Sequence, residues 1–188
     1  MAALVLILVL VLALAGCGAS DSTTTDSGPS RSPESAAGKL RVGELTVDSL
    51  AVGQELDVGV IAPAGDPAEE RALLIFLHGA GGSEESFLAD PAVLGGIAAL
   101  GDQAPVVAFP DGEESWWHER ASGDWERYVV GEVIPAVRRR FGADPRRVAI
   151  GGISMGGFGA YDIALRNPGR FCAVGGHSPA LWLAAEDT

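Results

Sequence analysis

The most constraining feature of the chain is one tight turn between two segments with opposite preferences. Residues 148–153, VAIGGI, have the apolar, β-branched character of a buried strand, and residues 155–166, MGGFGAYDIALR, favour a helix. Ser154 lies at the junction, with Gly152 and Gly156 two residues to either side, where a missing Cβ lets two backbone segments cross closely. Gly-x-Ser-x-Gly between a strand and a helix predicts an exposed serine in a strained backbone conformation, the form of a nucleophile elbow.

Strand-like and helix-like segments alternate along most of the chain. Nearly continuous apolar runs predict strands covered on both faces, and helical periodicity or an Asp-Pro start predicts the helices between them. The predicted strands cover residues 71–77, 104–110, 148–153 and 171–177, and the predicted helices cover residues 91–100, 124–141 and 155–166. This alternation predicts an α/β fold with a mainly parallel sheet and helices on both faces.

Smaller features refine the predicted fold. Residues 40–63 contain short alternating stretches separated by Gly and Asp, which predict antiparallel strands at a sheet edge. Pro135 lacks an N–H and is expected to bend or break the helix that contains it. The ADPRR segment, residues 143–147, is expected to be a turn, and Cys172, in an apolar run, a small core residue.

Four glycine-rich or polar stretches occur where predicted buried strands end. These stretches are HGAGG, FPDGEESWWH, GGISMGG and GGHSPALW. Because functional groups in mainly parallel sheets gather at the carboxyl edge, we expect these stretches to lie together.

The chemistry expected at this edge is acyl transfer with Ser154 as the nucleophile. The serine needs a base to take its proton and an acid to orient that base. It also needs donors for the oxyanion, one of which is the backbone N–H of Met155. The HGAGG loop is expected to supply the second donor, for which we choose the Ala80 N–H, with Gly81 as the neighbouring alternative. His78 in this loop is expected to pack structurally at the strand end.

Other side chains carry weaker predictions. Trp117, beside Trp116, is a candidate wall of a substrate pocket, and a loop packed on the core explains the pair equally well. His177 ends the strand next to the elbow and is a weak candidate for the pocket, less favoured as the base. His118 has no supporting pattern, and Asp162 lies eight residues beyond Ser154, too far along the predicted helix to orient a base. No base or acid is therefore assigned.

The N-terminus predicts a membrane-anchored protein. Residues 1–16 form an apolar, uncharged run that ends LAG before Cys17, which resembles a bacterial lipobox. The resemblance implies a lipoprotein signal peptide over 1–16 and a diacylglycerol on Cys17. Residues 17–38 then form the lipidated cysteine and a disordered tether, rich in Ser, Thr and Asp, and residues 39–188 form the folded domain. The predicted location is extracytoplasmic, on the bacterial cell membrane.

Two alternatives to this anchor remain open. An ordinary secretory signal can contain a cysteine by chance, and the two cysteines of the chain, Cys17 and Cys172, could instead form one disulfide.

Charge excludes one class of partner. The formal net charge is −12, and an acidic surface of this kind argues against binding nucleic acid or anionic lipid through charge. The sequence indicates no metal site and no dinucleotide-binding loop, and no cofactor is expected.

The motifs together resemble the putative-esterase family of α/β-hydrolases. LHGAGGS, FPDG…WW, DWERYVVGEVIPAVRRRF and RRVAIGGISMGGFGAYDIALRNPGRF carry the resemblance, which covers about residues 70–182. The family includes S-formylglutathione hydrolase-like, feruloyl-esterase-like and mycolyltransferase-like members. The resemblance implies hydrolysis of a small-molecule or cell-envelope ester through a Ser–His–acid triad, without metal or cofactor. It also implies that Ser154 is the nucleophile and that the Met155 and Ala80 N–H groups are the oxyanion donors.

One departure from the family is plain. Triad order in this fold is serine, then Asp or Glu, then His, and the family has the last two after further strands. The chain ends at Thr188, so we expect an incomplete hydrolase domain that lacks its last strands, with acid and base in further C-terminal sequence. An acyltransferase of the same fold and an inactive, truncated lipoprotein remain alternatives.

Overall fold

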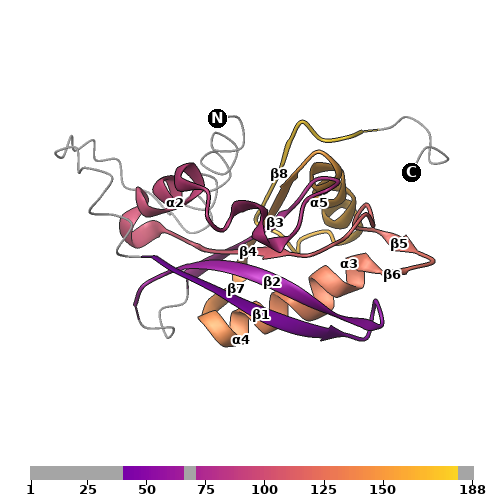
Figure 1. Ribbon diagram of the computed structural model, residues 1–188, viewed down its shortest axis with the longest axis horizontal. Coiled ribbons are helices and arrows are strands. Elements are labelled where there is room, and N and C mark those ends of the chain that lie inside the picture. Colours follow the sequence, from indigo (N-terminus) through magenta and orange to yellow (C-terminus); the bar gives the residue numbers. More distant parts are fainter. Residues whose placement is uncertain (1–39, 66–70, 182–188) are drawn as a thin grey trace.

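The computed structural model describes residues 40–65 and 71–181. Within this part, six strands form one sheet in the order β1–β2–β4–β3–β7–β8 (Figure 1). Their bounds are β1 Leu40–Ser49, β2 Gln54–Pro63, β3 Arg71–Leu77, β4 Val106–Pro110, β7 Ala143–Ile153 and β8 Ala173–His177. Two short strands, β5 Glu119–Arg120 and β6 Gly123–Asp124, pair separately. The predicted leader and tether, including Cys17, lie outside the described residues.

The sheet has an antiparallel edge and a parallel centre. β1 pairs with β2 and β2 with β4 in antiparallel fashion, which confirms the predicted antiparallel strands at a sheet edge. β3 is parallel to both β4 and β7, and β7 is parallel to β8. The carboxyl ends of these four strands therefore meet at one edge, as expected, and bring the four glycine-rich or polar stretches to it.

The ADPRR segment differs from the prediction of a separate turn. It forms the beginning of β7, where the pairing with β3 shifts register between Arg71 and Leu73. The Arg146 N–H donates to Asp144 Oδ1 at 2.8 Å, so the local turn exists as an irregularity inside a longer strand.

Helices lie at the three predicted positions, and two short helices that were not predicted lie on either side of the first of them. Their bounds are η4 Glu84–Phe87, α2 Pro91–Ala98, η5 Gly101–Gln103, α3 Trp125–Arg127, η6 Tyr128–Val133, α4 Ile134–Phe141 and α5 Met155–Arg166. Asp90 caps α2 as expected, with its carboxylate accepting from Ala92 N–H at 2.7 Å. The predicted helix 124–141 is interrupted ahead of Pro135 by η6, a π-helical turn in which Ile134 N–H donates to the Val129 carbonyl. This confirms the predicted local break.

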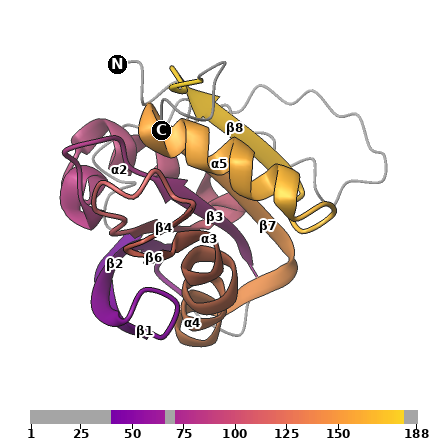
Figure 2. The ribbon, with the colours of Figure 1, turned by 90° about the vertical axis from the view of Figure 1, so that its right-hand side faces the viewer.

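Two cores cover the two faces of the sheet. Alternate side chains of β3 face opposite ways: Leu73, Ile75 and Leu77 belong to one apolar cluster, and Leu74 and Phe76 to the other. The first cluster includes side chains of α3, η6, α4 and α5, and the second those of α2. Figure 1 shows α2 and α4 on opposite sides of the sheet, and Figure 2 shows α5 beside β7 and β8. The observed architecture is the α/β arrangement that the alternation predicts.

Cys172 corrects one core prediction. It precedes β8 and is exposed, so it is not a small core residue. β8 is the last strand of the described sheet and its side chains are at most partly buried, because it pairs along one side only. Among the described residues, no helix has the length and apolar character to cross a membrane.

Candidate active site

Ser154 lies in a sharp turn between β7 and α5. Its φ of +54° and ψ of −115° are unusual for a residue with a side chain, and the residue is exposed. The two flanking glycines explain how the turn closes. A Cβ on Gly152 would overlap the Gly156 carbonyl, and a Cβ on Gly156 would overlap the Leu77 carbonyl. The strained, exposed elbow that the Gly-x-Ser-x-Gly pattern predicts is therefore present.

Backbone bonds tie the elbow to the end of β8. The Ser154 N–H donates to the His177 carbonyl at 3.0 Å, and the Ala180 N–H donates to the Ser154 carbonyl at 3.1 Å. His177 is half-buried, and its Nδ1 is buried without a hydrogen-bond partner among the described residues. His177 thus lies beside the elbow as predicted, in contact with Ser154 through its main chain.

The loop after β3 packs directly against the elbow. A Cβ on Gly79 would come within 3.3 Å of Ser154 Cβ. The Gly82 N–H donates to the Gly79 carbonyl at 3.0 Å, and Gly81 has a φ of +74°. Ala80 has no positive φ, so residues 79–82 form a type II turn, which requires a residue such as glycine at its third position.

The two candidate donors in this turn differ in their partners. The Gly81 N–H donates to Glu114 Oε1 at 2.6 Å. Within the described part of the chain, the Ala80 N–H has no acceptor, and Ala80 is exposed. The geometry therefore leaves Ala80, rather than Gly81, with an N–H for a ligand. Met155 is the first residue of α5, where N–H groups have no acceptor within the helix, and its side chain is buried.

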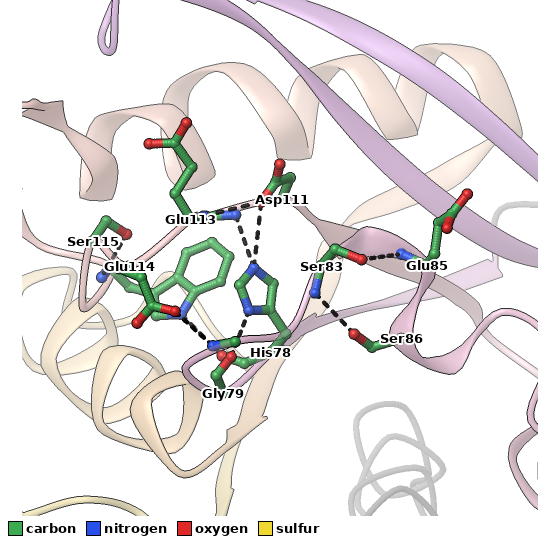
Figure 3. Close-up of polar contacts among 12 residues, drawn as sticks. His78, Gly79, Ser83, Glu85, Ser86, Asp111, Glu113, Glu114 and Ser115 are labelled. Carbon is green, nitrogen blue, oxygen red and sulfur yellow. Dashed lines mark hydrogen bonds and ion pairs between the residues drawn. The ribbon is translucent and has the colours of Figure 1, made fainter.

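His78 lies between the loop and the segment after β4 and bonds to both (Figure 3). Only 2% of it is exposed, its Nδ1 lies 2.8 Å from the Gly79 carbonyl oxygen, and its Nε2 accepts from Gly112 N–H at 3.0 Å. Because Nε2 is an acceptor, we assign the proton to Nδ1 and a neutral imidazole. Both ring nitrogens are occupied, which confirms the structural role expected of this histidine.

Trp117 corrects the prediction of a pocket wall. Its ring is fully buried and lies edge-on to His78, with the ring centroids 5.1 Å apart, and its Nε1–H donates to the His78 carbonyl at 3.3 Å. The space that the ring fills exists because Gly112 and Gly159 have no side chain. Trp117 is a core residue that joins the loop after β4 to α5, and no part of it faces an accessible pocket.

Trp116, its neighbour, is the half-buried member of the pair. Its ring contacts Phe158 edge-on at 5.9 Å between centroids, and His118 contacts the same Phe158 ring at 5.8 Å. Phe158 lies one turn of α5 beyond Ser154. Burial, followed by the charge of Arg120, lowers the pKa of His118, so its neutral form is favoured.

The carboxylates near the site have other partners. Asp111 Oδ1 accepts from Glu113 N–H at 2.9 Å and lies 3.6 Å from His78 Nε2. The His78 imidazole and the Glu113 N–H lower the pKa of Asp111. We regard the N–H as the firmer cause, because Nε2 already accepts from Gly112. Asp162 pairs with Arg166 at 3.0 Å, as expected for a solvated helix face.

The described residues thus provide part of what acyl transfer requires. They provide an exposed serine on a strained elbow and two unoccupied backbone N–H groups, those of Met155 and Ala80. No side chain among them is hydrogen-bonded to Ser154 Oγ. Sequence reasoning missed Glu114, because a lone glutamate in an acidic loop has no signal until the partner of its carboxylate is known.

Comparisons with known proteins identify the family of the chain. The family model described as Putative esterase matches residues 49–188. An esterase of Mycobacterium tuberculosis is 28% identical over 139 residues, which cover 68% of this chain and 30% of the relative. The S-formylglutathione hydrolase of Bos taurus is 28% identical over 156 residues, which cover 70% of this chain and 54% of the relative. The chain therefore spans about half or less of these relatives.

Solved structures share the fold. A ferulic acid esterase from Anaeromyces mucronatus superposes with a TM-score of 0.65 at 17% identity, covering 86% of this chain and 64% of that structure. An S-formylglutathione hydrolase from Staphylococcus aureus superposes with a TM-score of 0.59 at 19% identity, covering 72% and 56%. These similarities place the chain in the α/β-hydrolase fold. With the family model matching residues 49–188, the chain belongs to the putative-esterase family.

Proposed function

We propose that the natural protein is a serine esterase that cleaves carboxylic esters through an acyl-enzyme on Ser154. The Ser154 oxygen attacks the ester carbonyl carbon and gives its proton to a histidine. The carbon–oxygen bond to the alcohol then breaks, and the alcohol leaves with that proton. Water, deprotonated by the same histidine, releases the carboxylic acid and restores Ser154.

The observation that carries the proposal is the backbone of Ser154. A positive φ on an exposed serine costs about 1–3 kcal/mol and persists only where the surroundings enforce it. Here the crossing of Gly152 and Gly156 enforces it, and the result is a hydroxyl at the carboxyl edge of the sheet.

Two backbone donors support the same proposal. The Met155 N–H and the Ala80 N–H are proposed to bind the oxyanion of the tetrahedral intermediate. Removing one such donor typically lowers kcat by about 10²–10³-fold. The N-terminus of α5 adds a favourable partial positive charge beside the serine.

The base and the acid are proposed to be a histidine and an Asp or Glu from sequence that follows Thr188 in the natural full-length protein. Two facts support this: the carboxylates described near the site have other partners, and the matched relatives are longer than the chain. The substrate is proposed to be a small-molecule or cell-envelope ester.

Labelling by a fluorophosphonate probe tests the nucleophile. We expect the natural full-length protein to be labelled at Ser154, located by peptide mass spectrometry, and the Ser154→Ala variant to remain unlabelled. The same protein should hydrolyse a short p-nitrophenyl ester. S-formylglutathione and a feruloyl ester belong in the substrate panel, because relatives are named for them.

The alternatives give different results in the same assay. Transfer of the acyl group to an added alcohol or sugar in preference to water would identify an acyltransferase. A folded full-length protein with neither label nor turnover would identify a non-catalytic lipoprotein. Label on a residue other than Ser154 would refute the assignment of the nucleophile.

The membrane anchor is a separate proposal. We propose that Cys17 carries a diacylglycerol and holds the enzyme on the outer face of the bacterial cell membrane. The support is the short apolar leader that ends LAGC. Cells grown with an alkyne fatty acid should yield labelled protein in the membrane fraction, and Cys17→Ser should abolish the label. Cys172→Ser is the matched control and should retain it. An unlabelled protein with Cys17 and Cys172 joined in a disulfide would contradict the anchor.

A further inference from the structure

The middle of the type II turn at residues 79–82 makes one hydrogen bond to another part of the described chain. Glu114, in the loop after β4, accepts a hydrogen bond from the Gly81 N–H at 2.6 Å (Figure 3). A bond from an N–H to a carboxylate is shorter and stronger than one between neutral groups. Both Glu114 and Gly81 are exposed, so this bond lies at the rim of the site.

The N–H of Gly81 belongs to the peptide that distinguishes two kinds of turn. Type I and type II turns differ by a rotation of the central peptide, here the one between Ala80 and Gly81. After that rotation, the Ala80 carbonyl would point where the Gly81 N–H points now. It would then face the Glu114 carboxylate, and two acceptors would repel each other. Glu114 therefore favours the turn observed.

The loop that carries Glu114 is itself fixed on the core. The Gly112 N–H bonds to His78 Nε2, the Ser115 N–H donates to the Gly112 carbonyl at 3.1 Å, and the Trp117 N–H donates to Ser115 Oγ at 3.1 Å. Glu114 therefore connects the exposed turn at residues 79–82 to a loop that is itself bonded to buried residues. Nothing else among the described residues bonds to the middle of that turn.

We propose that Glu114 is a positioning residue, whose bond to the Gly81 N–H limits movement of the turn that presents the Ala80 N–H beside Ser154. This inference rests on the proposed esterase function. The carboxylate does not touch the reacting atoms, and its own negative charge opposes charge developing on the oxyanion. If Glu114 positions the turn, its removal in Glu114→Ala should lower kcat. If its charge is what matters, the same variant should raise kcat.

Three substitutions in the natural full-length protein separate the two. Glu114→Gln retains a side-chain oxygen at the same reach and removes the charge. Glu114→Asp retains the charge but is one methylene shorter, and Glu114→Ala retains neither. We expect Glu114→Ala and Glu114→Asp to lower kcat on a p-nitrophenyl ester by about tenfold, less than the loss of a whole oxyanion donor. KM should change by less than about twofold, because the ground-state carbonyl depends little on these donors.

Glu114→Gln should retain most of the wild-type kcat. Glu85→Ala removes another exposed carboxylate, one that lies outside this turn, and should match the wild type. Amide hydrogen exchange at Gly81, followed by NMR, gives a readout that does not depend on turnover. It should become faster in the Ala and Asp variants and stay slow in Glu114→Gln.

The outcomes distinguish this inference from the function on which it rests. An inactive wild-type protein, or a Ser154→Ala variant that still turns over, overturns the proposed function and this inference with it. An active, Ser154-dependent wild type with an unchanged kcat in Glu114→Ala and Glu114→Asp overturns the positioning role alone. A higher kcat in Glu114→Ala would assign to Glu114 a charge effect instead. If Glu114→Ala fails to fold, the Asp and Gln pair decides.

Discussion

Replacing Ser154 by alanine or glycine is expected to lower kcat for ester hydrolysis by at least about 10⁴-fold, with a folded protein in both cases. Loss of the nucleophile removes the acyl-enzyme route, and other serine hydrolases lose about that much or more. The side chain of Ser154 is exposed and makes no helix-capping bond, so its removal should not disturb the fold. Initial rates on a p-nitrophenyl ester, measured on the natural full-length protein, test this expectation.

The two variants should differ in stability. Alanine retains the Cβ that makes a φ of +54° unfavourable, whereas glycine adopts this conformation freely. The free energy of unfolding should therefore be about 1–2 kcal/mol higher for Ser154→Gly than for Ser154→Ala. Ser154→Gly should accordingly unfold at a higher denaturant concentration. At an ordinary helical or strand position, glycine instead costs about 0.5–1 kcal/mol relative to alanine. If Ser154→Gly is the less stable of the two, the strain assigned to the elbow is wrong.

The fold was predictable where local pattern and burial agree. Continuous apolar runs predicted β3 and β4 because both strands are covered on both faces, and the Asp-Pro start predicted α2. The segment at 143–147 was mistaken for a separate turn because its Asp-Pro pair favours one. Its place in β7 depends on pairing with Arg71, which lies far away in the sequence.

The candidate site was predictable in its backbone but not in its side chains. The elbow and the HGAGG loop follow from glycine spacing, because only glycine permits such close crossings. Which of two adjacent tryptophans is buried depends on the spaces left by Gly112 and Gly159, and no local signal identifies them. Cys172 was misjudged because an apolar run predicts burial, whereas its strand lies at the end of the described sheet.

Gly156→Ala is expected to destabilise the protein more than a glycine-to-alanine change at any other described glycine. The new Cβ would overlap the Leu77 carbonyl and come within 2.5 Å of the His78 carbonyl oxygen. Both are backbone atoms of the strand end and loop that support the elbow, so no side chain can rotate away. We expect a loss of at least about 4 kcal/mol in the free energy of unfolding, or no soluble protein at all.

Gly95→Ala is the matched control for this change. Gly95 lies in α2, is exposed, and has nothing within 4 Å of the position that a Cβ would take. Alanine is the better helix former, so this variant should gain about 0.5–1 kcal/mol. Chemical denaturation of both variants in the natural full-length protein measures the difference. A Gly156→Ala variant as stable as the wild type would mean that β3 and α5 do not cross as closely as described, and the elbow geometry of Ser154 would have to be abandoned with it.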